Sequence, residues 1–126
     1  EDVFVAKSGF GGAEYLLAGL VGESKTRKLS YQKIAQISSW NTARRFGLKG
    51  KGAIDIGFDA DIALVDPNAS YIVTAEDSFS SQEYTPFESF EINAKVTDTW
   101  LRGNRIFGDG NVLGAPNGKY LHRPTA

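Results

Sequence analysis

The chain has 126 residues, the size of one ordinary domain, and its 41% hydrophobic content predicts a folded globule. Its 14 Lys and Arg residues against 15 Asp and Glu give a net charge of -1, which argues against nucleic-acid and membrane partners. Since it has no cysteine and one histidine, His122, disulfide scaffolds and thiolate metal sites are excluded, and a multi-histidine metal centre is hard to build.

Signals for export or membrane insertion are missing from the sequence. No apolar run approaches the ~18–20 residues that cross a bilayer, and the chain begins Glu1-Asp2-Val3 without a cationic leader. We therefore expect a cytoplasmic protein. Because the chain contains no methionine, it also lacks an initiator residue, and we expect it to be a fragment.

The first third of the sequence predicts a loop and helices. Residues 1–11 are typical of a short extended piece that leads into a glycine-rich loop. Good helix formers predict a helix from Glu14 to Val21, ended by Gly22. A polar connection follows.

A second, amphipathic helix is expected to begin after Ser30, whose hydroxyl can cap the free backbone N–H groups. Its apolar stripe consists of Ile34, Ile37 and Trp40. Asn41 or Thr42 is expected to cap a further short turn, and Gly47 to end that turn in the left-handed conformation.

From Leu48 onward the pattern changes to short strands and turns. Strands are predicted at residues 62–65, 71–74, 96–101 and 105–107. Gly103-Asn104 is predicted as a two-residue hairpin turn, and residues 78–91 as a long loop. The result is an α+β chain with its helices first. Because neither half can bury both of its faces, each is expected to pack against something outside this sequence.

Few residues are candidates for chemistry. Asp59 and Asp61, two positions apart, form either a carboxylate metal site or, as we favour, ordinary turn and strand-entry positions. His122 is either a general base or, again favoured, a solvated histidine of the tail.

The glycine-rich loop offers a third candidate. Gly9, Gly11 and Gly12 lack the third glycine of a nucleotide fingerprint, so phosphate binding is disfavoured. A loop without side chains can still bring backbone groups close to a small ligand. Four aromatic residues of the long loop are interpreted as pins that fix it to the core: Phe79, Tyr84, Phe87 and Phe90.

Several motifs together resemble one family. Residues 29–48 contain L-S…W-N-T-A-R-R-F-G-L and are similar to the pattern L-S…T-N-P-A-R-x-F-G-L. Residues 51–67 resemble K-G-x-I-x-x-G-x-D-A-D-[LI]-x-[LV]-x-D-P, and similar matches follow at 84–88, 100–104 and 118–124. In this order they resemble the C-terminal part of the metal-dependent cyclic amidohydrolases, which include hydantoinase, dihydropyrimidinase, allantoinase and dihydroorotase. Trp40, Thr42 and Ser89 depart from the family pattern.

The resemblance implies an architecture. The family has a (β/α)8 barrel and a small β-sandwich made from both chain ends. By this resemblance the chain is an α+β fragment in which residues 1–47 form the last loop and closing helices of the barrel. Residues 48–110 would supply sandwich strands, and residues 111–126 a C-terminal tail that runs over the surface or toward a neighbouring subunit.

The resemblance also implies an activity. The family hydrolyses the ring C–N amide bond of a small cyclic amide with two divalent ions, usually zinc, whose ligands would all lie before Glu1. This chain is therefore expected to bind no metal and to contain no catalytic residue. The family element N-G-x-x-G-x-E resembles Ser8–Glu14, which makes Ser8, Gly9 and Phe10 the expected substrate-binding residues.

The expected partners follow from the same resemblance: the cyclic amide, the missing N-terminal barrel portion and further copies in a homo-oligomer. One alternative is a non-catalytic binding or interaction module derived from this family. A β-rich binding module unrelated to the family is the third possibility.

Overall fold

The computed structural model describes residues 9–122. The helical elements are η2 (Ala13–Tyr15), α1 (Leu16–Gly22), α2 (Tyr31–Ala35), the π-helical η3 (Gln36–Trp40) and α3 (Asn41–Arg45). The strands are β1 (Ile62–Asp66), β2 (Tyr71–Ile72), β3 (Glu91–Ile92), β4 (Lys95–Leu101), β5 (Asn104–Gly108) and β6 (Asn111–Val112). The predicted α+β class with helices first is confirmed.

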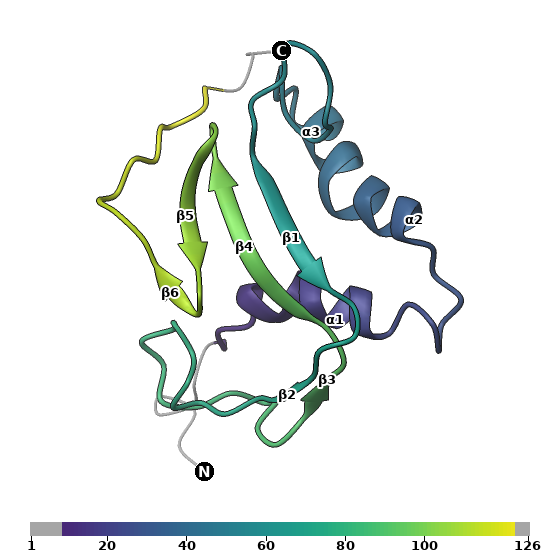
Figure 1. Cartoon of the computed structure of the whole chain (residues 1–126), viewed down its shortest axis with the longest axis vertical. Coiled ribbons are helices and arrows are strands. Elements are labelled where there is room, and N and C mark those ends of the chain that lie inside the picture. The colour runs from purple at the N-terminus through teal and green to yellow at the C-terminus, as the bar shows by residue number, and fades with distance from the viewer. Residues whose placement is uncertain (1–8, 123–126) are drawn as a thin grey trace.

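The second predicted helix is one continuous rod made of α2, η3 and α3 (Figure 1). It begins as expected, because Ser30 Oγ accepts a hydrogen bond from Lys33 N over 3.2 Å. Within the π-helical stretch, Ser38 Oγ donates a hydrogen bond to the carbonyl of Ile34 over 2.7 Å. A serine hydroxyl that bonds this carbonyl competes with the backbone N–H groups of the helix.

The predicted cap at Asn41 or Thr42 is wrong. Asn41 has helical angles, φ -63° and ψ -38°, so the helix passes through it without a break. The helix instead ends at Gly47, as predicted, with φ 65°. The N–H of Gly47 bonds the carbonyl of Arg44, and the N–H of Leu48 bonds that of Ala43, so two of the last carbonyls of the helix are satisfied.

The strands form a four-stranded antiparallel sheet in the order β1-β4-β5-β6 and a small sheet of β2 and β3. The β4–β5 turn lies one residue earlier than predicted. Arg102 and Gly103 have φ of 48° and 78°, and Asn104 already pairs with Leu101. Two successive positive φ angles give the twist that a two-residue hairpin requires, and glycine supplies the second without strain.

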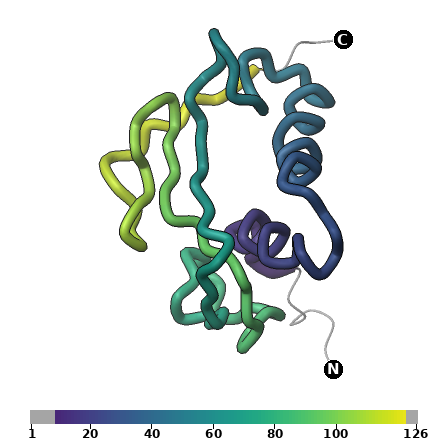
Figure 2. Tube along the Cα trace, turned by 45° about the vertical axis from the view of Figure 1, so that its right-hand side comes forward, coloured from purple at the N-terminus to yellow at the C-terminus, as the bar shows by residue number. Residues whose placement is uncertain are grey.

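The helices lie on one side of the four-stranded sheet, and the tail runs from β6 back across the end of the sheet toward α3 (Figure 2). α1 contacts β3 and β4. At this junction the buried residues Ala18, Val73 and Ile92 form a small core. Tyr15, Tyr71 and Val96 pack around it.

Large apolar side chains remain on the surface, with Ile54 85% and Ile56 98% exposed. The accessible surface is 9688 Å². A compact monomer of this mass exposes about 6,600 Å². Among residues 9–122, no helix is both long and apolar enough to cross a bilayer.

Candidate functional site

The glycine-rich segment 9–12 lies against the long loop that follows β2, although the two are far apart in the sequence. The hydroxyl of Tyr84 donates a hydrogen bond to the carbonyl oxygen of Gly9. The backbone N–H of Gly11 donates to the side-chain oxygen of Gln82. Two backbone groups of the expected substrate loop are therefore held by side chains from residues 78–87.

A carboxylate fastens the end of the same segment. Glu14 accepts hydrogen bonds from the hydroxyl of Ser78 and from the backbone N–H of Phe79, the latter over 3.2 Å. The approach is close enough to require glycine at position 11. A Cβ there would lie 2.6 Å from Ser80 Oγ and 2.8 Å from Ser80 Cβ.

Aromatic rings close the contact on its apolar side. The ring of Phe87 meets that of Phe10 edge to face at 5.9 Å and that of Tyr15 at 5.8 Å. Such edge-to-face pairs add to the stabilisation that comes from burying the apolar area of the rings. Phe79 makes a third edge contact, with Phe107 on β5. Phe79, Tyr84 and Phe87 thus hold the loop, the last two against residues 9–15, whereas the fourth predicted pin, Phe90, is 52% exposed.

The expected substrate residues have different outcomes. Ser8 lies outside the described residues. Gly9 and Phe10 both contact the loop 78–87, through Tyr84 and Phe87 respectively. The Phe10 side chain is 56% exposed. Their role toward a substrate stays a prediction.

A buried hydroxyl lies behind this segment. Within the described part of the chain, the Tyr15 hydroxyl oxygen is buried and has no hydrogen-bond partner. Burial raises the pKa of the neighbouring Tyr71, and the nearby Tyr15 and Glu14 raise that pKa further.

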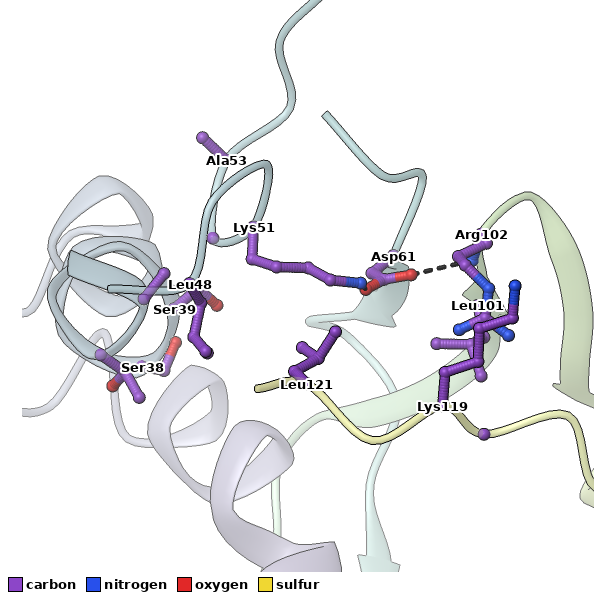
Figure 3. Close-up of a pocket in the computed structure, with 14 residues that line it drawn as sticks. Ser38, Ser39, Leu48, Lys51, Ala53, Asp61, Leu101, Arg102, Lys119 and Leu121 are labelled. Atoms are coloured by element: carbon purple, nitrogen blue, oxygen red, sulfur yellow. Dashed lines mark hydrogen bonds and ion pairs between the residues drawn. The ribbon is translucent and has the colours of Figure 1, made fainter. Parts of the chain in front are cut away.

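A cavity of about 400 Å³ lies at the other end of the sheet, between α3, the loop 48–53, the β4–β5 turn and the tail (Figure 3). Lys51 extends across it toward Asp61. Its ammonium group pairs with Asp61 and lies 2.7 Å from Asp59 Oδ2. Asp61 also accepts a hydrogen bond from Arg102 N over 2.8 Å.

This ion-pair network explains the two aspartates. Burial raises the pKa of Asp61, but hydrogen bonds from Lys51 and Arg102 outweigh burial, and the pKa is lowered. Hydrogen bonds to Asp59 and Asp61 raise the pKa of Lys51. The two carboxylates therefore form ion pairs with Lys51. In residues 9–122 no group of three His, Cys, Asp or Glu side chains could hold a metal ion.

His122 lies in the tail with its ring on the edge of Tyr120, 4.8 Å between centroids, and its side chain is exposed. The favoured interpretation, a solvated tail histidine, agrees with this placement.

The sequence analysis missed the residues whose side chains bond the glycine segment and the two aspartates. Gln82 was not singled out, and Tyr84 was assigned only a general pinning role. Glu14 appeared only as the start of a predicted helix and inside a family motif, and Lys51 only inside a family motif. A lysine followed by two aspartates two positions apart is the signal that could have identified its network.

Comparison with known proteins gives the family of this chain. Residues 13–106 match the amidohydrolase family. The chain belongs to that family. The resemblance to cyclic amidohydrolases is confirmed by its relatives, of which an allantoinase of Rubrobacter xylanophilus is 38% identical over 96% of this chain. A dihydroorotase of Halobacterium salinarum is 36% identical over 97% of it.

Solved structures of the family share the fold. A D-hydantoinase (dihydropyrimidinase) from a Thermus species superposes with a TM-score of 0.81 and 25% identity, covering 89% of this chain. This chain covers only part of each of these proteins: 27% of the allantoinase, 28% of the dihydroorotase and 25% of the hydantoinase. The amidohydrolase chain described here thus spans about a quarter of the length of its relatives.

Proposed function

We propose that this amidohydrolase chain is the C-terminal portion of an enzyme that hydrolyses the ring C–N amide bond of a small cyclic amide. The observation that carries the proposal is the match over nearly the whole chain to proteins named allantoinase and dihydroorotase. The substrate would be of the hydantoin, dihydropyrimidine, allantoin or dihydroorotate type. These rings share a –CO–NH– unit, which donates one hydrogen bond and accepts others.

The chain would contribute the substrate loop. Backbone groups of Ser8 and Gly9 are proposed to bind the ring amide, since complementary main-chain groups recognise –CO–NH– without any particular side chain. The Gly9 carbonyl accepts a hydrogen bond from the Tyr84 hydroxyl, and we assign the N–H of Gly9 to the substrate. Phe10 is proposed to line the pocket.

The chemistry itself is assigned to residues outside this sequence. Two divalent ions, proposed to be zinc, activate water and polarise the amide carbonyl in such enzymes when bound. The donor set of residues 9–122 does not fit them, because no cluster of three metal-ligating side chains occurs there. No step of the reaction is assigned to a metal on this part of the chain.

The proposed partners are the barrel portion and further copies of the protein. Ile54 and Ile56 are almost fully exposed, and the total surface is well above that of a compact monomer. Burying such apolar surface favours association. From the family resemblance we also propose the division into barrel-closing residues 1–47, sandwich residues 48–110 and tail 111–126.

The test is hydrolysis by the natural polypeptide that contains this sequence, expressed without truncation. It is assayed against hydantoin, dihydrouracil, allantoin and dihydroorotate, before and after metal chelation. Hydrolysis of at least one ring, lost on chelation and restored by zinc, is the expected result. Binding of a ring without turnover by the metal-loaded protein would instead favour the non-catalytic module.

A further inference from the structure

The glycine segment 9–12 has no regular secondary structure, so no helix or strand ladder fixes its backbone. Gly12 is held locally, because its carbonyl accepts a hydrogen bond from Tyr15 N, but Gly9 and Gly11 are bonded by side chains 75 and 71 residues away, those of Tyr84 and Gln82. Just beyond the segment, Glu14 accepts a hydrogen bond from Ser78, 64 residues away. The contact is also tight, because Ser80 occupies the space that a Cβ on Gly11 would need.

Such a contact matters for a loop that binds ligand through its main chain. Glycine populates more backbone conformations than any other residue, and a free loop pays for ordering when it binds. Bonds already made in the ligand-free protein remove that cost. The Tyr84 and Gln82 bonds go to one carbonyl and one N–H two residues apart, so they fix the orientation of the intervening peptides.

We infer that Tyr84, Gln82 and Glu14 are positioning residues that hold the backbone of the glycine segment in place for the ring amide. The inference rests on the proposed function, because it takes segment 9–12 as the substrate loop. None of the three side chains needs to touch the substrate. The ring of Phe87, packed on Phe10 at 5.9 Å, holds the apolar side of the same loop.

The first experiment measures order directly, without activity. Amide hydrogen exchange of the peptide 9–14 is followed by mass spectrometry in the untruncated protein and in Tyr84→Phe, Gln82→Ala and Gln82→Glu. Loss of one hydrogen bond is expected to speed exchange about 2- to 12-fold in the first two variants. Gln82→Glu keeps an acceptor oxygen for the N–H of Gly11 and should exchange like the wild type.

Matched controls come from exposed residues elsewhere. Tyr120→Phe removes the same hydroxyl from the tail, where the side chain is 81% exposed, and Gln32→Ala truncates a glutamine on the surface of α2. Neither should change exchange in the peptide 9–14. Exchange in Tyr84→Phe and Gln82→Ala that equals that of the controls overturns the inference.

The second experiment measures the consequence for substrate. Tyr84→Phe, Gln82→Ala and Glu14→Ala are expected to raise KM about 2- to 12-fold with kcat unchanged, the signature of lost binding rather than lost chemistry. Gln82→Glu should restore the wild-type KM. A wild type that is active while these variants keep its KM overturns the inference and leaves the proposed function intact. A wild type that opens no ring overturns the proposed function and the substrate role of segment 9–12. The exchange data would still show whether the side-chain bonds order that segment.

Discussion

The backbone N–H of Arg102 donates a hydrogen bond to Asp61 Oδ1 over 2.8 Å and so joins two segments that are 41 residues apart. A second bond, from the N–H of Gly103 to the carbonyl of Ala60, lies beside it. The β4–β5 turn is thereby fastened to the start of β1. Because Asp61 also pairs with Lys51, the loop after α3 belongs to the same unit (Figure 3).

Replacing Asp61 should loosen this unit. Asp61→Ala leaves the Arg102 N–H without its acceptor and Lys51 with Asp59 alone, and we expect a loss of about 2–3 kcal/mol in the free energy of unfolding. Urea unfolding of the untruncated protein measures it. Glu91→Gln, which neutralises an exposed carboxylate on β3, is the control. An equal loss in both variants would show that the Asp61 network contributes nothing specific.

The same network sets a pH dependence. The folded protein holds the pKa of Asp61 below its ordinary value of 3.8, so the unfolded chain takes up protons first as the pH falls. Stability is therefore present above pH 3.8 and is lost as the pH drops through the folded pKa. Thr97 and then Arg105 lower the pKa of Asp98, which acts in the same direction.

Lys51 makes stability fall at high pH. Its pKa lies above the ordinary 10.5, so its contribution is complete below pH 10.5 and is lost as the pH rises through the folded value. Urea midpoints measured across both limits should fall at each end. In Asp61→Asn the fall should be smaller at both ends; if its pH profile equals that of the wild type, the assignment to Asp61 is wrong.

Alanine substitutions at Gly52 and Gly57 distinguish the cost of backbone strain from the cost of overpacking. Both have positive φ, 87° and 83°, which costs an alanine about 1–2 kcal/mol. At Gly52 an added Cβ would also lie 2.6 Å from Ala43 Cβ and 2.9 Å from the Ser39 carbonyl, whereas at Gly57 nothing lies within 4 Å. We expect Gly52→Ala to lose a further ~1–3 kcal/mol relative to Gly57→Ala. Thermal unfolding of the two variants checks it, and equal losses would mean that the neighbours of Gly52 give way.

The hydroxyl of Tyr15 provides a test in the opposite direction. Within residues 9–122 it is buried without a hydrogen-bond partner, so Tyr15→Phe removes an unsatisfied polar group and keeps the ring contact with Phe87. The free energy of unfolding should stay equal or rise by about 1 kcal/mol. Urea unfolding measures the change. A loss of stability would instead reveal a partner that residues 9–122 do not supply.

Local patterns were sufficient for much of the fold. Ser30 caps its helix and Gly47 ends one, because each acts on backbone groups within a few residues. The strand predicted at 96–101 is β4, within one residue. The errors are also local: Asn41 was expected to cap a helix that runs through it, and the β4–β5 turn was placed one residue late. A cap residue is recognised by type, but the continuing rod around Asn41 decides its conformation.

The candidate site divides in the same way. The order of motifs along the chain identified the family, and several of these motifs contain a helix cap, a turn or an ion pair of the fold. The sequence thus determined by itself the α+β class, the family and the glycine segment. Only the tertiary structure decided that Tyr84 and Gln82 hold that segment, and that Asp61 serves Lys51 and Arg102. The physical reason is that hydrogen bonds and ion pairs form between groups that are close in space, and residues 41 to 75 positions apart leave no periodicity that reveals their contact.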